Sequence, residues 1–283
     1  MVSWLVEPLA YEFMQRGLLV AVLVGVVCAV VGCYIVLRGM AFLGDALSHA
    51  ILPGLAVGYL ASAGDSPSLF WWALGAAVLS SVSISALSRG GRIKQDTAIG
   101  IVFAGMFALG IALISTMRSY AVDLSHFLFG NILGVTTEDV WLTAGVSLVV
   151  LLIILAFYKE FMVLSFDLQL ATTLRLPARA LEILLSVLTA VAIVVSLQAV
   201  GVALVVAMLV TPAATAYLLT KNLRRMMLLA AAIAASSGVV GLYVSYYFNV
   251  ASGAAIVLAC TAVFIAVWLG QQVRSSLRAR SAS

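Results

Sequence analysis

Long runs without a charged residue constrain this chain more than any other feature. Most of them reach or approach the roughly 20 residues that an α-helix needs to cross a bilayer. The runs are 17–37, 68–88, 97–117, 140–157, 183–220, 226–248 and 250–270. Only 9% of the residues are charged and 64% are hydrophobic, whereas about a quarter of the residues in soluble domains are charged. The sequence therefore predicts an all-α, polytopic membrane bundle, with residues 1–283 in a single domain.

We expect nine membrane-spanning helices, and eight spans with one half-inserted segment is the alternative. The expected spans are about 17–37, 44–62, 68–88, 96–117, 138–158, 180–198, 200–220, 226–248 and 251–271. The sixth and seventh spans are the hardest to separate, because residues 196–203 must then form a very tight turn.

The basic residues indicate the orientation of these spans. In the nine-span arrangement, 13 of the 15 Lys and Arg residues fall on one side, and only Arg16 and Arg118 fall on the other. Short cytoplasmic loops carry an excess of Lys and Arg. The N-terminus is therefore expected outside and the C-terminus in the cytoplasm. The net charge of +4 follows from this topology and gives no reason to invoke nucleic acid.

An aspartate and a histidine interrupt the apolar pattern of the second span. Asp45 and His49 are four positions apart, so they share one helix face with their Cβ atoms about 6 Å apart. Ionisable groups inside a membrane span are costly, and they usually serve ions, protons or substrates. Three interpretations stay open on spacing alone: an ion pair that locks the helix, a metal site, or a proton relay.

The metal interpretation has a defined chemistry. A carboxylate and an imidazole without a thiolate suit divalent first-row metals such as Mn²⁺, Fe²⁺ or Zn²⁺. Two ligands are too few for tight capture, but a two-fold homodimer that meets at this helix would offer four. No permanently bound cofactor is expected, because the metal would be the transported substrate.

Small residues and a proline shape the same helix. Ala46, Ala50, Gly54 and Gly58 recur at four-residue steps and predict close packing against a neighbouring helix. Pro53 lacks an N–H, so it is expected to kink the helix and to leave the carbonyl of His49 free. Pro212 is expected to bend a later span in the same way.

One cytoplasmic connection, 159–182, is longer than most of the others and is expected to do more than connect. Within it, residues 167–177 predict a short helix that starts at Asp167 and stops at Pro177. A partner could bind this helix, and an interfacial amphipathic helix is the alternative. The candidate contact residues are Phe166, Asp167, Leu168, Leu170, Leu174, Leu176 and Pro177.

Several motifs of catalysis are missing from the sequence. No GxxxxGK[ST] loop that would cradle phosphates occurs, and no Ser–His–Asp or HExxH pattern appears. The chain is therefore not expected to be an enzyme, and uphill transport would need a partner or an ion gradient. A proton-coupled carrier that works alone, with Asp45 and His49 as a relay, is the alternative function.

Taken together, five segments resemble the ABC-3 family of permeases, the membrane subunits of bacterial ABC importers for manganese, zinc or ferrous iron. They are "VLRGMAFLGDALSHAILPGLAVGY" (36–59), "SHFLFGNILGVT" (125–136), "FDLQLATTLRLP" (166–177), "AVGVALVVAMLVTPAATA" (199–216) and "SGAAIVL" (252–258).

The resemblance implies a type II ABC importer plan in the bacterial plasma (inner) membrane. In that plan two permease copies span the membrane in contact with lipid, ATP-binding subunits dock on the cytoplasmic face, and a metal-carrying solute-binding protein docks outside. The metal ligands of the family map onto Asp45 and His49, and its coupling helix maps onto about 167–177. Neither the metal nor the choice between homodimer and heterodimer follows from the sequence.

Overall fold

The computed structural model describes residues 7–62, 66–88, 93–116, 132–166, 171 and 173–281. These residues form helices and connecting turns, and no strand occurs among them. Eight of the helices are long and apolar enough to cross a membrane. They are α2 (Glu12–Leu37), α5 (Ser66–Leu87), α6 (Gln95–Ser115), α8 (Thr137–Ala156), α11 (Ala178–Val200), α12 (Val202–Leu219), α13 (Leu223–Phe248) and α14 (Ser252–Ser281). The predicted all-α membrane bundle is confirmed.

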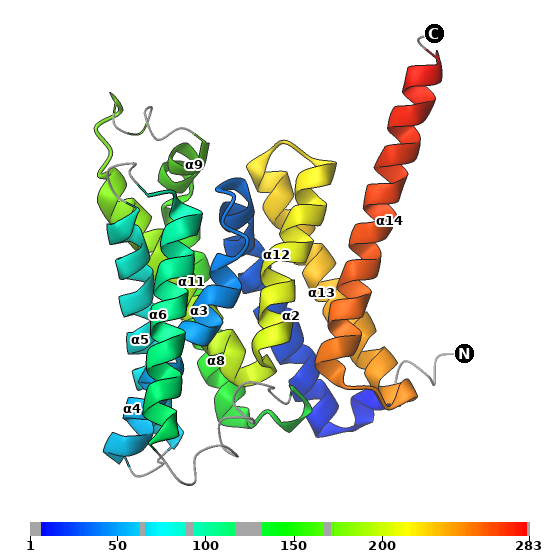
Figure 1. Ribbon diagram of the computed structural model, residues 1–283. Helices are drawn as coiled ribbons and strands as arrows, with labels where there is room; N and C mark the ends of the chain where they lie inside the picture. Colours follow the sequence, from blue (N-terminus) through cyan, green and yellow to red (C-terminus); the bar gives the residue numbers. More distant parts are fainter. Residues whose placement is uncertain are drawn as a thin grey trace.

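The expected span 44–62 is divided into two short helices, α3 (Leu43–Ala50) and α4 (Leu52–Ser62). Together they run from the end of the bundle where α2 ends towards the opposite end (Figure 1). The kink expected at Pro53 takes the form of a break at Ile51, two residues before the proline. Proline cannot donate a backbone hydrogen bond, and its ring crowds the preceding turn.

A single residue connects α11 to α12. Gly201 has φ +81° and ψ 168°, a backbone conformation that is essentially restricted to glycine. This one-residue turn separates the sixth and seventh spans, as the sequence predicts. Three short helices complete the described chain: η1 (Pro8–Ala10), η2 (Ile132–Gly134) and α9 (Tyr158–Phe166).

Helix α2 lies at the centre of the packing and contacts α12 and α13 closely. In its most apolar window 72% of the residues are buried, against 17% in α6 and in α14. Gly32 allows the closest approach, because a Cβ there would collide with the backbone carbonyl of Leu209 in α12. The most exposed helices carry apolar side chains outward, as expected of surfaces that meet lipid or other membrane subunits.

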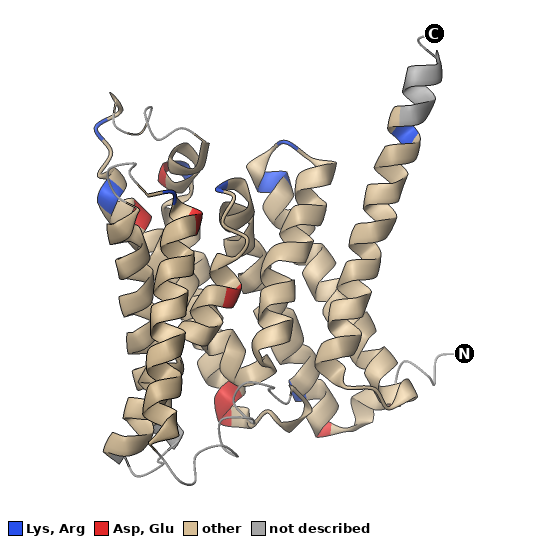
Figure 2. Cartoon of the chain, in the orientation of Figure 1, with Lys and Arg blue, Asp and Glu red and all other residues tan. Residues whose placement is uncertain are grey.

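Charge is distributed unevenly along the bundle. Figure 2 shows most of the described Lys and Arg residues at the end where α9 and the C-terminal end of α14 lie. The acidic segment within α3 lies between the two charged ends of the bundle. Helix α3 therefore places its only carboxylate away from the ends where most other charges gather.

Candidate metal site

Asp45 lies in the first turn of α3 and His49 in its last. The imidazole Nε2 is 3.7 Å from the carboxylate Oδ1, and the two side chains are 29% and 37% exposed, respectively. That distance is too long for a hydrogen bond. Within the described part of the chain, neither side chain makes another ion pair or hydrogen bond. The two groups therefore face a common space with their lone pairs available, and they do not form a tightly locked pair.

Two phenylalanines of α6 fix the orientation of the imidazole. The ring centroids of Phe107 and Phe103 lie 5.6 Å and 6.0 Å from that of His49, both in edge-to-face geometry. The two phenyl rings also stack on each other at 5.7 Å. The Nδ1 atom of His49 is buried and has no hydrogen-bond partner among the described residues. Nε2 is consequently the nitrogen on the side of Asp45.

The rest of α3 is held by packing. Ala46 and Ala50 are each 1% exposed, and a Cβ on Gly44 would lie 2.6 Å from the side chain of Leu209 in α12. The hydroxyl of Ser48 donates to the Gly44 carbonyl at 2.9 Å. Because the small residues are buried, the face with Asp45 and His49 stays partly open.

The small residues of α4 pack against α5. A Cβ on Gly54 would collide with the backbone carbonyl of Trp72 and lie 2.7 Å from the Cβ of Ala76. A Cβ on Gly58 would lie 2.8 Å from the Trp72 ring. The small residues of the second span therefore have different surroundings along its length. Ala46 and Ala50 are buried where α3 packs, and Gly54 and Gly58 lie on α5.

The break between α3 and α4 differs from the sequence expectation in one respect. The carbonyl of His49 is not free, because the backbone N–H of Ile51 donates to it. Pro53 packs against α6, where a Cβ on Gly110 would lie 3.2 Å from its Cδ. Pro212 is buried in α12, and the helix continues through it from Val202 to Leu219. The carbonyl of His49 is therefore not left without a partner, as the sequence had suggested.

Asp45 and His49 are not joined by a further metal-binding side chain within the described ranges. Among the described residues, no group of three or more His, Cys, Asp or Glu side chains is close enough to hold a metal ion. The three cysteines are buried and unpaired, and Cys28 lies 3.4 Å from the hydroxyl of Ser196.

The candidate partner-binding segment is described only in part. Asp167, Leu168 and Leu170 lie outside the described residues. Phe166 ends α9 and is 59% exposed, and Leu174, in the turn that follows Thr173, is 55% exposed. Leu176 is half-buried, and its N–H donates to the Ala171 carbonyl at 3.1 Å.

Two features of this segment differ from the expected helix 167–177. Helical conformation ends at Thr173, and Pro177 is the residue that precedes α11. Proline favours the start of a helix, where its missing N–H costs nothing. Helix α9 was not predicted, because no Gly or Pro separates it from the apolar run of α8.

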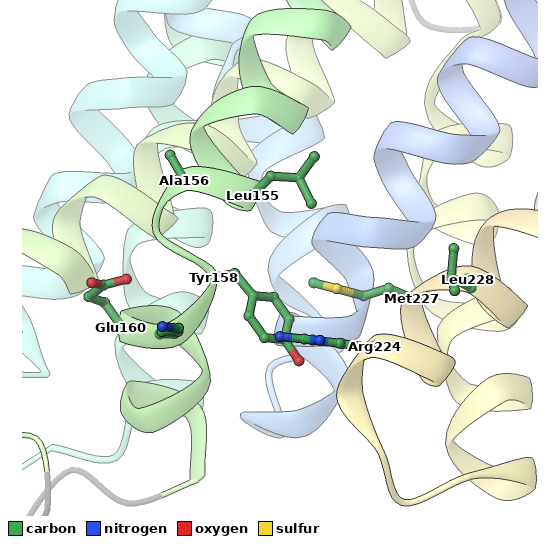
Figure 3. A pocket seen from close by; sticks show the side chains of 8 residues that line it. Leu155, Ala156, Tyr158, Glu160, Arg224, Met227 and Leu228 are labelled. Atoms are coloured by element: carbon green, nitrogen blue, oxygen red, sulfur yellow. The ribbon is translucent and has the colours of Figure 1, made fainter.

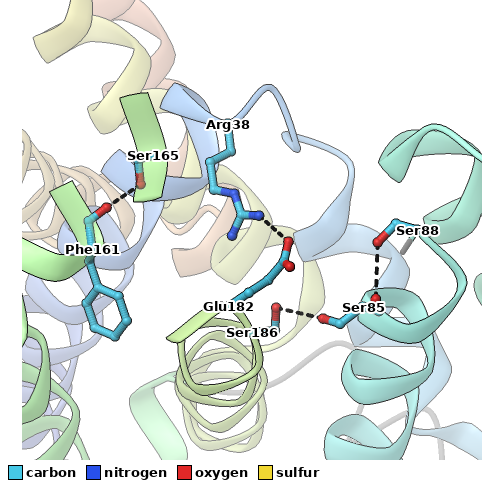
Figure 4. A network of polar contacts seen from close by, with 7 residues as sticks. All are labelled: Arg38, Ser85, Ser88, Phe161, Ser165, Glu182 and Ser186. Atoms are coloured by element: carbon cyan, nitrogen blue, oxygen red, sulfur yellow. Dashed lines mark hydrogen bonds and ion pairs between the residues drawn. The ribbon is translucent and has the colours of Figure 1, made fainter. Parts of the chain in front are cut away.

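An ion pair that the sequence did not predict joins the end of α2 to the start of α11. Arg38 Nη2 lies 2.5 Å from Glu182 Oε1, and the side chains are 9% and 22% exposed, respectively. In Figure 4, Ser186 lies one turn along from Glu182 and accepts a hydrogen bond from Ser85 of α5 at 3.2 Å. Arg38 and Glu182 are 144 positions apart in the sequence, so no local spacing signal predicts this contact.

Comparison with known proteins agrees with this architecture. The family model described as "ABC 3 transport family" matches residues 10–271. The chain is 46% identical over 258 residues to the manganese transport system membrane protein MntC of Halalkalibacterium halodurans, covering 91% of this chain and 87% of that protein. It is also 39% identical over 274 residues to a probable iron transport system membrane protein of Haemophilus influenzae, covering 97% and 99%.

A solved structure has the same fold. PsaBC from Streptococcus pneumoniae, solved in complex with Fab, superposes with a TM-score of 0.81 at 41% identity, and the match covers 95% of each chain. The family match along most of the sequence and the similarity to these relatives lead to one assignment. This chain is a member of the ABC 3 transport family, a family of metal-transporting membrane permeases.

Proposed function

We propose that this chain is the membrane-spanning permease subunit of an ATP-driven importer for a divalent transition metal, and that Asp45 and His49 contact the metal in transit. The observation that carries the proposal is the geometry of α3. A carboxylate and an imidazole lie 3.7 Å apart and partly exposed, on a short helix inside an apolar bundle. Ionisable residues at such a place mark an ion pathway.

The donor set supports a metal more strongly than a locked ion pair. An ion pair that fixes a helix would be expected at hydrogen-bonding distance, whereas 3.7 Å leaves both groups able to bind a third atom. One oxygen and one nitrogen donor suit Mn²⁺ and Fe²⁺ as well as Zn²⁺. Manganese is the first candidate, because the relative with 46% identity is named a manganese transport protein; iron is the second.

Two copies of the chain would complete the site. Two ligands per chain become four when the α3 helices of two permeases face each other across a two-fold axis. A site split between subunits opens when the subunits move apart, so that the metal can be released. We propose a homodimer on this ground, fed by a metal-binding solute-binding protein outside and driven by ATP-binding subunits on the cytoplasmic face.

The distribution of charge supports the proposed orientation. The end of the bundle with α9 and the end of α14 carries most of the Lys and Arg residues (Figure 2). By the positive-inside rule this end faces the cytoplasm, and the start of α2 faces outward. The proposed ATPase contact, from Phe166 to Pro177, then lies on the cytoplasmic side.

Metal uptake by the reconstituted complex tests the proposal. Vesicles containing the permease and its ATP-binding subunit, with the solute-binding protein outside, should accumulate radioactive manganese when ATP is inside. Asp45→Ala and His49→Ala should each abolish accumulation without changing the amount of ATPase bound. Asp96→Asn is the matched control, since this exposed carboxylate lies in the first turn of α6.

Two outcomes would contradict the proposal. Uptake at the wild-type rate in both alanine variants would remove Asp45 and His49 from the pathway. Uptake by the lone chain under a pH gradient, without ATP or any ATPase, would instead establish a proton-coupled carrier.

A further inference from the structure

A pair of adjoining cavities lies between α9 and the start of α13, on the end of the bundle rich in Lys and Arg. Their volumes are about 630 Å³ and 650 Å³, and Tyr158, Lys159 and Arg224 line both of them. The proposed metal site uses none of these residues. Figure 3 shows Arg224 of α13 lying against the ring of Tyr158 of α9 at the first cavity.

Three cations surround the cavities without a carboxylate partner. Lys159 and Arg224 line both cavities and Lys221 lines the second, and none of the three forms an ion pair within the described part of the chain. Glu160 also lines the first cavity, but Figure 3 places it on the far side of Tyr158 from Arg224. The net charge of this lining favours an anion.

The guanidinium of Arg224 is held in a defined place. Its central carbon lies 5.3 Å from the centroid of the Tyr158 ring, which is within the range of a cation–π contact. Arg224 is also the second residue of α13, where the helix dipole favours negative charge. A planar guanidinium at such a position is suited to bidentate binding of a phosphate group.

The other wall of the first cavity is apolar and belongs to membrane-spanning helices. Leu155 near the end of α8 is 65% exposed, and Leu228 in α13 is 72% exposed; both line the cavity together with Met227. Basic groups therefore stand at one end of the cavity and exposed leucines at the other. This is the chemical division of an amphiphile, with an anionic head and an apolar chain.

We propose that these cavities bind one anionic phospholipid of the surrounding membrane. The headgroup phosphate binds Arg224 and Lys159, with Lys221 nearby, and an acyl chain runs along Leu155 and Leu228. A soluble subunit docked on the same end would contact the cations, but it could not cover leucines within the spans. The apolar wall is the reason to prefer a lipid.

Retention of lipid during purification tests this proposal. The chain is extracted from membranes containing phosphatidylglycerol and phosphatidylcholine, and the lipid that remains bound is identified by native mass spectrometry. Wild type should retain phosphatidylglycerol in preference to phosphatidylcholine. Arg224→Gln and Lys159→Gln should each lower that preference about fivefold, the change expected for ~1 kcal/mol per cation.

Arg225→Gln is the matched control, because Arg225 is the exposed neighbour of Arg224 but lines neither cavity. An equal loss in Arg225→Gln would mean that only diffuse charge acts, and would overturn the proposal. Unchanged retention in Arg224→Gln would overturn it too. So would loss of bound ATP-binding subunit from this variant with its lipid unchanged, since the cavity would then belong to the subunit interface.

A measurement on wild type alone covers the case in which a variant fails to fold. Added phosphatidylglycerol should raise the unfolding temperature of the detergent-solubilised chain, whereas phosphatidylcholine should not. Inorganic phosphate distinguishes the lipid from a free anion, because it cannot occupy the apolar wall. Equal stabilisation by inorganic phosphate, or none by phosphatidylglycerol, would refute the lipid assignment.

Discussion

Loss of the carboxylate of Glu182 should destabilise the bundle through Arg38. Arg38 caps the C-terminal end of α2, and only 9% of its side chain is exposed. Its Nη1 atom already has no hydrogen-bond partner among the described residues. Glu182→Ala removes the carboxylate at 2.5 Å and leaves the buried cation uncompensated. Figure 4 shows that this contact bridges α2 and α11.

The size of the effect follows from the burial of the two partners. Breaking a fully buried ion pair by removing one partner costs about 3–5 kcal/mol. Glu182 is 22% exposed, so water reaches this side of the pair and the expected loss is at the lower limit, about 3 kcal/mol. Replacing both partners by apolar residues, as in Arg38→Met with Glu182→Leu, should cost less than Glu182→Ala alone, because no unpaired charge remains.

Reversible unfolding in mixed micelles, titrated with a denaturing detergent, measures these free energies. The single variants Arg38→Met and Glu182→Leu and their combination form a double-mutant cycle, whose coupling energy should be about 2 kcal/mol or more. Additive effects of the two single changes would show that the contact contributes nothing, and would refute the argument from burial.

Two further changes test the packing and the imidazole orientation. Gly32→Ala should prevent α2 from reaching α12 and lower the yield of folded protein. Gly75→Ala, where a Cβ meets no atom within 4 Å, should fold like wild type in the same size-exclusion assay; equal yields of the two variants would count against the close contact. Phe107→Gln should give the buried Nδ1 of His49 a hydrogen-bond partner and tighten manganese binding by about tenfold, measured by calorimetry. Phe107→Leu should not tighten it, and equal affinities for both variants would contradict the role assigned to this ring.

The sequence was sufficient for the all-α class and for the approximate place of the long spans, because a membrane helix is encoded locally by about 20 apolar residues. It also located the site of the break, since Pro53 cannot donate to the carbonyl of His49. It did not show that α3 would end at Ala50 as a separate helix. The extent of a break depends on how the two halves pack, here on the close approaches at Gly44 and Gly54.

The surroundings of the candidate site could not be predicted from one sequence. The pairing of Asp45 with His49 is a spacing of four residues and is visible in the sequence. In the contacts of Phe103 and Phe107 with His49 the paired residues are more than fifty positions apart, and no periodicity encodes them. The ion pair between Arg38 and Glu182 could not be predicted either. Each charge is explained locally by its position at the end of a span, so neither indicates the other as its partner.

The break at Ile51 changes the packing of the second span along its length. Helix α4 packs on α5 and α6, and Gly54 lies against the backbone of Trp72 in α5. Helix α3 also contacts α5 and α6, but it meets Leu209 of α12 at Gly44 as well, and the backbone of the same Leu209 meets Gly32 of α2. Because the helix is broken at Ile51, the segment that carries Asp45 and His49 can approach α12 while α4 lies along α5.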